Sequence, residues 1–296
     1  MKYPVSTSNH LTYDFDYVIP MTEQIARLIN CGFKYLDFNF AEGQGDLRCP
    51  FLHSGWEKWI DGIADKAASM GASFNQAHAV CYDGLKYDGM TKRDIIELQK
   101  RSVVAAARLG IPWIVYHAIF TPDRDWYKIN YEAFAPILEI SKKYGVGMAF
   151  ENIPQTRRDI ELSHTDCLID FADSFGDSLV GVAWDVGHGA IGDGQGDIIT
   201  DPAYHLAKVG KRLKATHIHD NLGTSDDHLA PFEGTIDWDK VMRALSDIGY
   251  EHSFTFEAHN AVRRIPSGRP DLIDDKIRYL HRVGEVLVSW DNGFKM

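Results

Sequence analysis

Long apolar runs are missing from this chain of 296 residues. No stretch approaches the roughly 20 consecutive apolar residues that a membrane-spanning helix needs. The opening residues, MKYPVSTSNH, also lack the apolar core of a secretory signal. These two absences predict a cytoplasmic protein that has no membrane partner.

Cysteine is scarce, and no two of the four cysteines are close enough in sequence to form a CxxC pair. Scattered cysteines in a chain without a secretory signal are expected to be reduced thiols. The sequence therefore gives no sign of a disulfide framework or of a zinc knuckle.

Clusters of basic residues are absent as well, and the formal net charge is −11. A nucleic-acid surface needs gathered lysine and arginine to displace phosphate counterions. This chain offers only short groups such as Lys142–Lys143 and Lys211–Arg212. The charge balance disfavours a nucleic-acid partner.

What remains is an ordinary globular composition, with 45% hydrophobic and 25% charged residues. No low-complexity segment or long linker divides the chain, so residues 1–296 are expected to form a single domain. Parallel barrels commonly exceed about 250 residues as one domain. A homo-oligomer is compatible with the sequence.

Short apolar runs alternate with amphipathic helical runs, which is the pattern of a parallel sheet covered by helices. The order and number of these runs predict an α/β fold, a single (β/α)₈ TIM barrel. The predicted strands are residues 11–15, 33–40, 73–80, 113–119, 147–153, 180–187, 214–220 and 253–258.

The predicted helices end where glycine follows, as expected for a left-handed cap. Six of them have this signal, at Gly32, Gly71, Gly110, Gly145, Gly176 and Gly249. The helical ranges are 22–31, 55–70, 91–109, 128–144, 165–175, 202–213, 237–248 and 270–289.

Nine metal-capable side chains occupy six separated stretches, most of them late in a predicted strand. The stretches recur about one βα unit apart, and the carboxyl ends of the strands in a closed parallel barrel converge on one face. These side chains are therefore expected to meet. They are His78, His117, Glu151, Asp185, His188, His217, Asp226, His228 and Glu257.

Gathering several carboxylates and imidazoles in one buried mouth carries a large desolvation cost unless cations balance them. The joint pattern therefore predicts a divalent metal, although a single histidine or glutamate near a strand end is more often a structural group. Three carboxylates with one imidazole suit Mn²⁺, Mg²⁺ or Co²⁺ at least as well as Zn²⁺. Further histidines shift the preference toward zinc.

The segments FENIP, AWDVGHG, THIHDN, SDDH and FTFEAH resemble the xylose isomerase-like TIM-barrel superfamily. This superfamily holds sugar isomerases and epimerases, inosose dehydratase-like enzymes and the endonuclease IV family. The resemblance covers about residues 70 to 260. It implies a small-molecule sugar or sugar phosphate as substrate.

By resemblance to the ketose epimerases, one metal would be held by Glu151, Asp185, His217 and Glu257. His219 faces the same side of its strand as His217. The resemblance favours His217, because the family's ligand stands three residues before an acidic residue, here Asp220. His188 stands where the epimerases contact substrate. The chain departs from the epimerases in two places. Arg157 replaces a carboxylate expected six residues after Glu151, and Gly223 replaces an arginine expected six after His217.

Resemblance to endonuclease IV implies a different use of the same residues, in a trinuclear zinc centre that cleaves abasic DNA. His78, His117 and Glu151 would hold one ion, and the four epimerase-type ligands the second. His188, Asp226 and His228 would hold the third. A non-catalytic sugar-binding barrel that kept its metal is a third interpretation.

The four-ligand set makes chemical sense for isomerisation or epimerisation. A proton must leave a carbon beside a carbonyl, and a metal stabilises the resulting enediolate. Glu151 and Glu257, from the fifth and eighth strands, suit the roles of base and acid. We assign these two residues as catalytic and expect a metal-dependent sugar isomerase or epimerase.

Weaker candidates lie in the loops. His53 and Trp56 follow the second strand and could close over a sugar ring. Arg157 follows the fifth strand, where a cation would suit a phosphate or an acid. All three are predicted substrate contacts.

Overall fold

A computed structural model describes residues 3–12, 20–41, 48–81, 91–119, 125–154, 164–192, 199–264 and 269–290. Eight parallel strands form one sheet in the order β7-β6-β5-β4-β3-β2-β1-β8. The strands are β1 (Val5–Ser8), β2 (Tyr35–Asn39), β3 (Ser73–His78), β4 (Trp113–Tyr116), β5 (Gly147–Glu151), β6 (Val180–Asp185), β7 (Leu213–His217) and β8 (Phe254–Phe256).

The sheet closes into a barrel between β7 and β8. Ile218, directly after β7, forms a parallel bridge with Phe256 of β8. The Ile218 N–H donates to the Thr255 carbonyl at 2.8 Å, and the Glu257 N–H donates to the Ile218 carbonyl at 3.2 Å. The predicted (β/α)₈ TIM barrel is confirmed.

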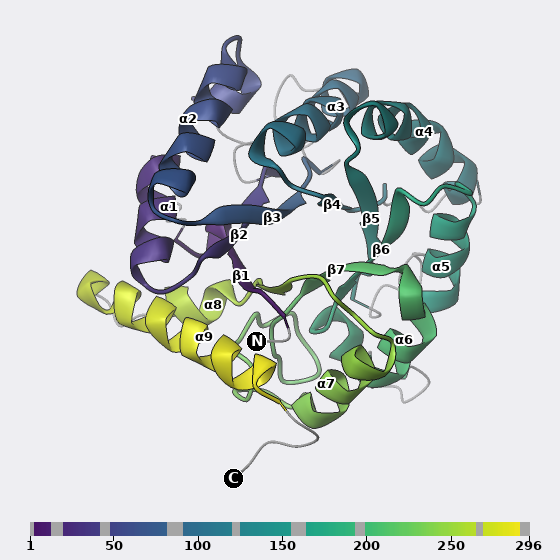
Figure 1. Ribbon diagram of the computed structural model, residues 1–296. Coiled ribbons are helices and arrows are strands. Elements are labelled where there is room, and N and C mark those ends of the chain that lie inside the picture. The colour runs from purple at the N-terminus through teal and green to yellow at the C-terminus, as the bar shows by residue number, and fades with distance from the viewer. Residues whose placement is uncertain are drawn as a thin grey trace.

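Helices ring the outside of the barrel (Figure 1), and their apolar faces pack on the outward side chains of the strands. Among the described residues, every helix is too short or too polar to cross a bilayer. The α-helices are α1 (Met21–Asn30), α2 (Trp56–Ser69), α3 (Lys92–Leu109), α4 (Trp126–Tyr144), α5 (Thr165–Asp173), α6 (Pro202–Val209), α7 (Trp238–Asp247), α8 (His259–Arg263) and α9 (Ile273–Val288). Short 3-10 turns are η1 (Asn9–Thr12), η3 (Pro50–Leu52), η6 (His188–Ala190), η7 (Gly210–Arg212) and η8 (Pro270–Leu272).

The helix ends follow the local signals in the sequence. Thr91 caps α3 with a full capping box, because its hydroxyl accepts from the Asp94 N–H and Asp94 accepts from the Thr91 N–H. All six predicted cap glycines have positive φ, as at Gly110, where φ is 73°. Helix α6 is shorter than predicted, since it ends at Val209 and η7 follows. The short α8 was not predicted.

The predicted first strand, residues 11–15, is wrong. The strand is Val5–Ser8, and the next residues form η1, while residues 13–15 lie outside the described part of the chain. All four β1 residues are buried, yet three are hydroxyl residues. They carry little of the apolar pattern that marks a strand, because part of the barrel interior at this position is polar.

The barrel interior is filled differently on its two sides. Val115, Ala149, Ala183 and Ala215 pack together inside β4 to β7. The Trp113 ring fills the space at the amino end, and it requires Gly147, where an added Cβ would lie 2.2 Å from a ring carbon. Inside the other strands, polar side chains such as Gln76 and Thr255 hydrogen-bond each other.

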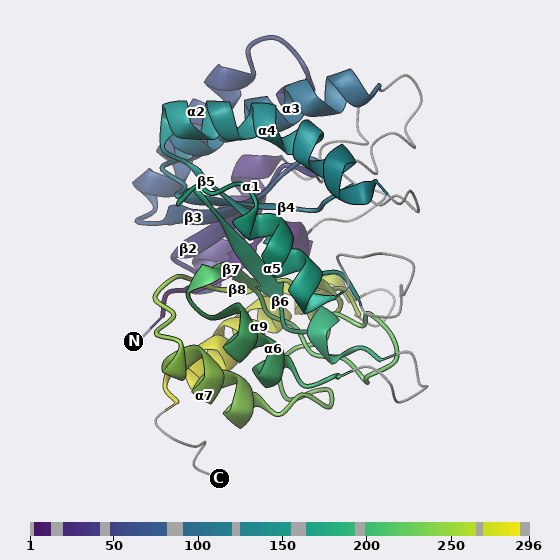
Figure 2. The ribbon, with the colours of Figure 1, turned by 90° about the vertical axis from the view of Figure 1, so that its right-hand side faces the viewer.

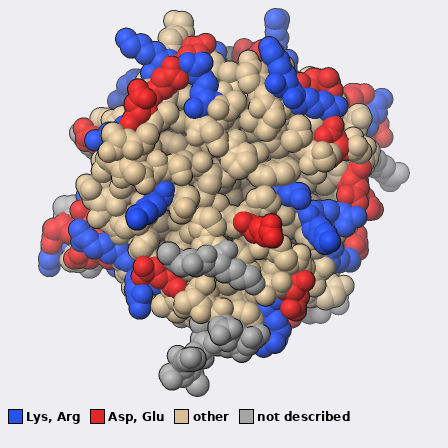
Figure 3. Space-filling model, in the orientation of Figure 1, with Lys and Arg blue, Asp and Glu red and all other residues tan. Residues whose placement is uncertain are grey.

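The two ends of the barrel differ. The N-terminus lies at the amino end of the barrel, at the left in Figure 2. Figure 3 views that end, and shows lysine, arginine, aspartate and glutamate mostly around the rim, with uncharged residues over most of the centre. The metal-capable side chains lie at the opposite end, where the strands finish.

His205 is a buried histidine of α6 that packs on Trp184 of β6. The Thr165 hydroxyl donates to His205 Nδ1 at 2.7 Å, and His205 Nε2–H donates to the Ile199 carbonyl at 2.7 Å. The imidazole stacks on Trp184 with 5.3 Å between ring centroids. Burial lowers the pKa of His205 below its usual range.

Because the pKa of His205 is lower in the folded chain, falling pH protonates the unfolded chain first. Its contribution to stability is complete above the unfolded pKa of about 6.5 and is lost as pH falls below it. We expect the loss of unfolding free energy between pH 7.5 and 5.5 to be smaller in His205→Gln than in the native chain. Urea titrations at both pH values measure this, and equal losses would contradict it.

Candidate metal centre

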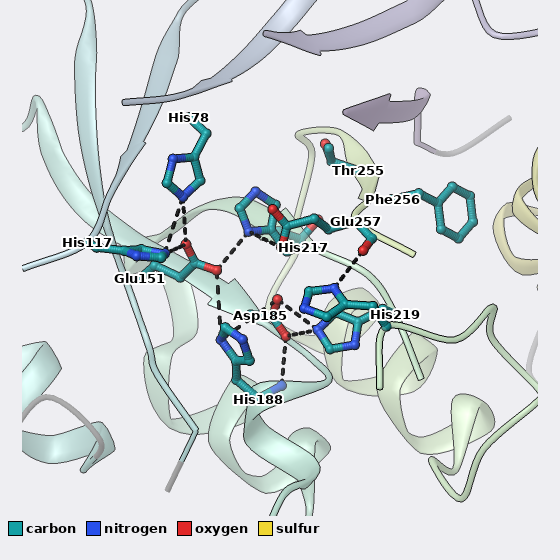
Figure 4. A network of polar contacts seen from close by, with 12 residues as sticks. His78, His117, Glu151, Asp185, His188, His217, His219, Thr255, Phe256 and Glu257 are labelled. Carbon is teal, nitrogen blue, oxygen red and sulfur yellow. Dashed lines mark hydrogen bonds and ion pairs between the residues drawn. The ribbon is translucent and has the colours of Figure 1, made fainter. Parts of the chain in front are cut away.

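Four of the predicted ligands meet at the carboxyl end of the barrel (Figure 4). Glu151, Asp185 and His217 are the last residues of β5, β6 and β7, and Glu257 directly follows β8. Each offers one donor atom within 4.8 Å of the other three. We call these four residues the core group. Three carboxylates and one imidazole form a donor set that suits a divalent cation.

Glu151 is the central residue of the site and is 2% exposed. Its Oε1 lies 2.7 Å from His217 Nδ1, and its Oε2 lies 2.9 Å from His117 Nε2 and 3.5 Å from His78 Nε2. The two oxygens therefore face different histidines. His217 Nδ1 also lies 3.8 Å from Glu257 Oε2.

The electrostatics of the core group keep both glutamates ionised. Burial raises the pKa of Glu151, but His217 and His117 overcome it and hold that pKa well below its usual range. The pKa of Glu257 is lowered in the same way by His217 and His228 against burial. Burial lowers the pKa of His217, yet Glu151 and Glu257 raise it to about 9. In the metal-free protein, protons on the imidazoles balance these carboxylates.

His78 and His117, the histidine pair, lie beside Glu151. Their Nε2 atoms are 3.2 Å apart. A tetrahedral ion with bonds of about 2.0 to 2.1 Å requires about 3.3 Å between donors, and the contacts of Glu151 Oε2 with the pair are close to this value. The predicted meeting of the pair with Glu151 is present in the fold.

A further group surrounds Asp226. Its Oδ2 lies 3.1 Å from His228 Nε2 and 3.4 Å from His188 Nε2. His219 Nε2 lies 3.7 Å from Asp226 Oδ1 and 2.9 Å from Asp185 Oδ1. These four residues, His188, His219, Asp226 and His228, also present donors within 4.8 Å of one another. We call them the outer group.

The structure separates His217 from His219, the two histidines that were expected to face the same side of their strand. His217 faces the core group, whereas His219 lies between Asp185 and the outer group. Gly187 makes room for His219, because an added Cβ would lie 1.9 Å from its ring. The position of His219 beside Gly187, in the outer group, supports His217 as the ligand of the core group.

Backbone carbonyls fix the ring orientation of three of these histidines. The Nδ1 atoms of His78, His188 and His228 lie 2.9, 2.9 and 2.7 Å from the carbonyl oxygens of Ala79, Asn152 and Glu257. A carbonyl can only accept, so each Nδ1 carries the proton. With the rings held in this way, their Nε2 atoms are available as ligand atoms.

Two residues of the site were missed by the sequence analysis. Asp37, inside β2, is fully buried, and burial raises its pKa to about 6 against the opposing effects of His217 and His78. An acidic residue inside the apolar run YLDFNF was the available signal. Cys81 follows β3, with Sγ 3.8 Å from His117 Nδ1. Burial raises the pKa of Cys81, but His117 and His78 lower it to about 6.

The three predicted substrate contacts remain predictions. His53 is exposed at the end of η3. Trp56 begins α2, where its ring meets Phe51 edge-on at 6.1 Å and the Arg101 guanidinium lies 5.5 Å above it. These packing contacts account for the position of Trp56. Arg157 lies outside the described residues.

The sequence profile of the xylose isomerase-like TIM barrel family matches residues 25–283, which is most of the chain. The chain belongs to this family. Its members share the barrel whose carboxyl end holds the core group here. One curated relative is the uncharacterized protein y4fM of Sinorhizobium fredii, 30% identical over 181 residues, covering 58% of this chain and 55% of that protein. The chain spans about half the length of the curated relatives it matches.

Solved structures share the complete fold of this family member. A D-tagatose 3-epimerase-like protein superposes with a TM-score of 0.69 at 19% identity, covering 97% of this chain and 98% of its own. The D-psicose 3-epimerase of Clostridium cellulolyticum H10, solved with D-tagatose, gives 0.70 at 17% identity, covering 96% and 99%. At identities this low, the superpositions establish a common fold and nothing more.

Proposed function

We propose that this xylose isomerase-like protein is a divalent-metal-dependent isomerase or epimerase of a sugar or sugar phosphate. The observation that carries the proposal is the core group, which places three carboxylates and an imidazole within 4.8 Å at the carboxyl end of the barrel. Active sites of TIM barrels lie at this end. The epimerase names of the structural neighbours support the same class of substrate.

The core group would hold the ion, which is expected to be Mn²⁺, Mg²⁺, Co²⁺ or Zn²⁺. When bound, the ion would polarise the sugar carbonyl and stabilise the negative charge of an enediolate. Asp185 and His217 complete the ligand set. His188, whose Nδ1 lies 3.8 Å from Asp185 Oδ2, is assigned to contact the substrate.

Proton transfer is assigned to Glu151 and Glu257. One carboxylate takes the proton from the carbon beside the carbonyl, and the C–H electrons form the enediolate double bond. The partner, carrying a proton, returns it to the opposite face of that carbon in an epimerisation, or to the neighbouring carbon in an isomerisation. The lowered pKa of both residues supplies the ionised base at neutral pH, so the proton that the partner delivers is one that it takes up from solvent.

Hydrogen exchange tests this function before the substrate is known. Metal-loaded protein is incubated in deuterated water with a panel of ketoses and ketose phosphates. We expect one deuterium to enter the carbon beside the carbonyl of the true substrate, measured by mass spectrometry and proton NMR. No exchange with any sugar under any of the four metals would favour a non-catalytic, sugar-binding barrel.

A second candidate is a phosphodiesterase acting on abasic DNA. It is favoured by one observation, the presence of the histidine pair and the outer group beside the core group. The net charge of −11 opposes it. Three bound zinc ions together with cleavage of an abasic duplex, and no cleavage of the intact duplex, would replace the sugar proposal with this one.

A further inference from the structure

A cysteine lies against the histidine pair, along the ring edges that face away from Glu151. Cys81 Sγ is 3.8 Å from His117 Nδ1 and 4.0 Å from His78 Nδ1. The Nε2 atoms of both rings face Glu151. The pair therefore lies between the Glu151 carboxylate and the Cys81 thiol. Each ring can bind a metal ion on one of these two sides, through Nε2 beside Glu151 or through Nδ1 beside Cys81.

The thiol side has a fourth donor. The Ala79 carbonyl oxygen lies 2.9 Å from His78 Nδ1 and 3.7 Å from Cys81 Sγ. A tetrahedral zinc ion with bonds of about 2.3 Å to sulfur and 2.0 Å to nitrogen requires about 3.6 Å between these donors. The two sulfur–nitrogen spacings, 3.8 and 4.0 Å, lie within a few tenths of an ångström of that value, so small rotations of the side chains would close the site.

We propose that His78, Cys81 and His117 bind Zn²⁺ or another soft divalent ion through their Nδ1, Sγ and Nδ1 atoms. Binding forms the three metal–ligand bonds, releases the Cys81 thiol proton and the Nδ1 protons of His78 and His117 to solvent, and leaves each ring neutral with its proton on Nε2. The Ala79 carbonyl, which accepts the His78 Nδ1 proton in the metal-free protein, becomes available to the ion.

Glu151 supports such an ion from outside its coordination shell. With Nδ1 bound to metal, the His117 Nε2–H donates to Glu151 Oε2, which lies 2.9 Å away. A carboxylate behind a histidine ligand fixes the ring and raises its basicity. Four donors on the thiol side, against three on the carboxylate side, favour the site at Cys81.

The two sites would select different ions. A thiolate with two imidazoles prefers zinc or another soft ion, whereas the carboxylate-rich core group accepts Mg²⁺ or Mn²⁺. The ion at Cys81 would therefore be distinct from the ion proposed for sugar chemistry, although Glu151 contacts both sites. This proposal goes beyond the proposed function and does not depend on it.

Cobalt binding tests the site directly. Chelator-stripped, reduced protein is titrated with Co²⁺ and followed by absorption spectroscopy. We expect a near-ultraviolet sulfur-to-cobalt band whose final intensity corresponds to one thiolate ligand and which disappears when Zn²⁺ is added. The band should be lost in Cys81→Ser and kept in Cys167→Ser, a control that removes another partly exposed cysteine. Zinc affinity should fall by at least about 100-fold in Cys81→Ser, more than the loss of an outer partner causes.

Thiol labelling gives a readout on the native chain that does not depend on a variant folding. Saturating Zn²⁺ should protect Cys81 from iodoacetamide, measured by peptide mass spectrometry, and leave the labelling of Cys167 unchanged. Cobalt binding without a sulfur band, or equal labelling of Cys81 with and without zinc, would overturn the proposal. Deuterium exchange into a sugar is a separate result, so failure of either proposal is recognised without the other.

Discussion

Turnover should be abolished in Glu257→Gln while the fold is kept. An amide cannot accept a proton from carbon, and the loss of a general base typically costs about 10²- to 10⁴-fold in rate. The Glu257 Oε2 lies 3.8 Å from His217 Nδ1, beyond hydrogen-bond distance. Its replacement therefore breaks no hydrogen bond to His217 and loses only the longer-range attraction of His217 and His228, so the unfolding free energy of the metal-free protein should fall less than in a variant of Glu151.

The measurements for this variant are deuterium exchange on the responsive sugar, Mn²⁺ affinity by calorimetry and urea unfolding. Metal affinity should fall, because a neutral amide replaces one of three anionic donors. Glu251→Gln is the matched control, since it makes the same change on an exposed residue near the start of β8, at the other end of the barrel. Full activity in Glu257→Gln would show that the acid and base assignment is wrong.

Glu151→Gln should abolish turnover and also destabilise the metal-free protein by about 3 kcal/mol. The change weakens two buried charge-assisted hydrogen bonds, to His217 at 2.7 Å and to His117 at 2.9 Å. Each such bond contributes about 1.5 to 3 kcal/mol. It also leaves buried imidazoles without the anion that balances them.

The comparison between the two glutamate variants isolates this effect. Urea unfolding near pH 7 in the presence of a chelator measures the loss of unfolding free energy. This pH is suitable because a carboxyl with a lowered pKa contributes its stability above the unfolded pKa of about 4.3 and loses it as pH falls below that value. The unfolding free energy should follow the order native, Glu257→Gln, Glu151→Gln, with the large step at the last. Equal stability of the two variants would contradict the central position of Glu151 in the hydrogen-bond network.

Much of the fold could be read from local patterns. The apolar runs and their glycine-capped helices predicted seven of the eight strands, because burial and capping leave their signals in neighbouring residues. The missing case is β1, whose sequence VSTS has hydroxyl side chains where an apolar run would mark a strand. Its place is set by pairing with β2 and β8, which are distant in sequence.

The candidate site shows the same division. The spacing of histidines and carboxylates along the chain predicted that they would meet, and every one of the nine lies in a donor group or within contact distance of one. The sequence alone did not reveal Asp37 or Cys81. Neither belongs to a local motif, and each is recognised only by the side chains that other strands bring to it.

The sequence by itself determined the order of strands and helices and therefore which residues stand at the strand ends. Only the tertiary structure decided how these donors are grouped. It turned one Glu151 oxygen to His217 and the other to the histidine pair, and it placed Cys81 behind that pair. The physical reason is that chain order fixes which strand carries a side chain, whereas distances of 3 to 4 Å between strands depend on register, closure of the barrel and side-chain rotamers.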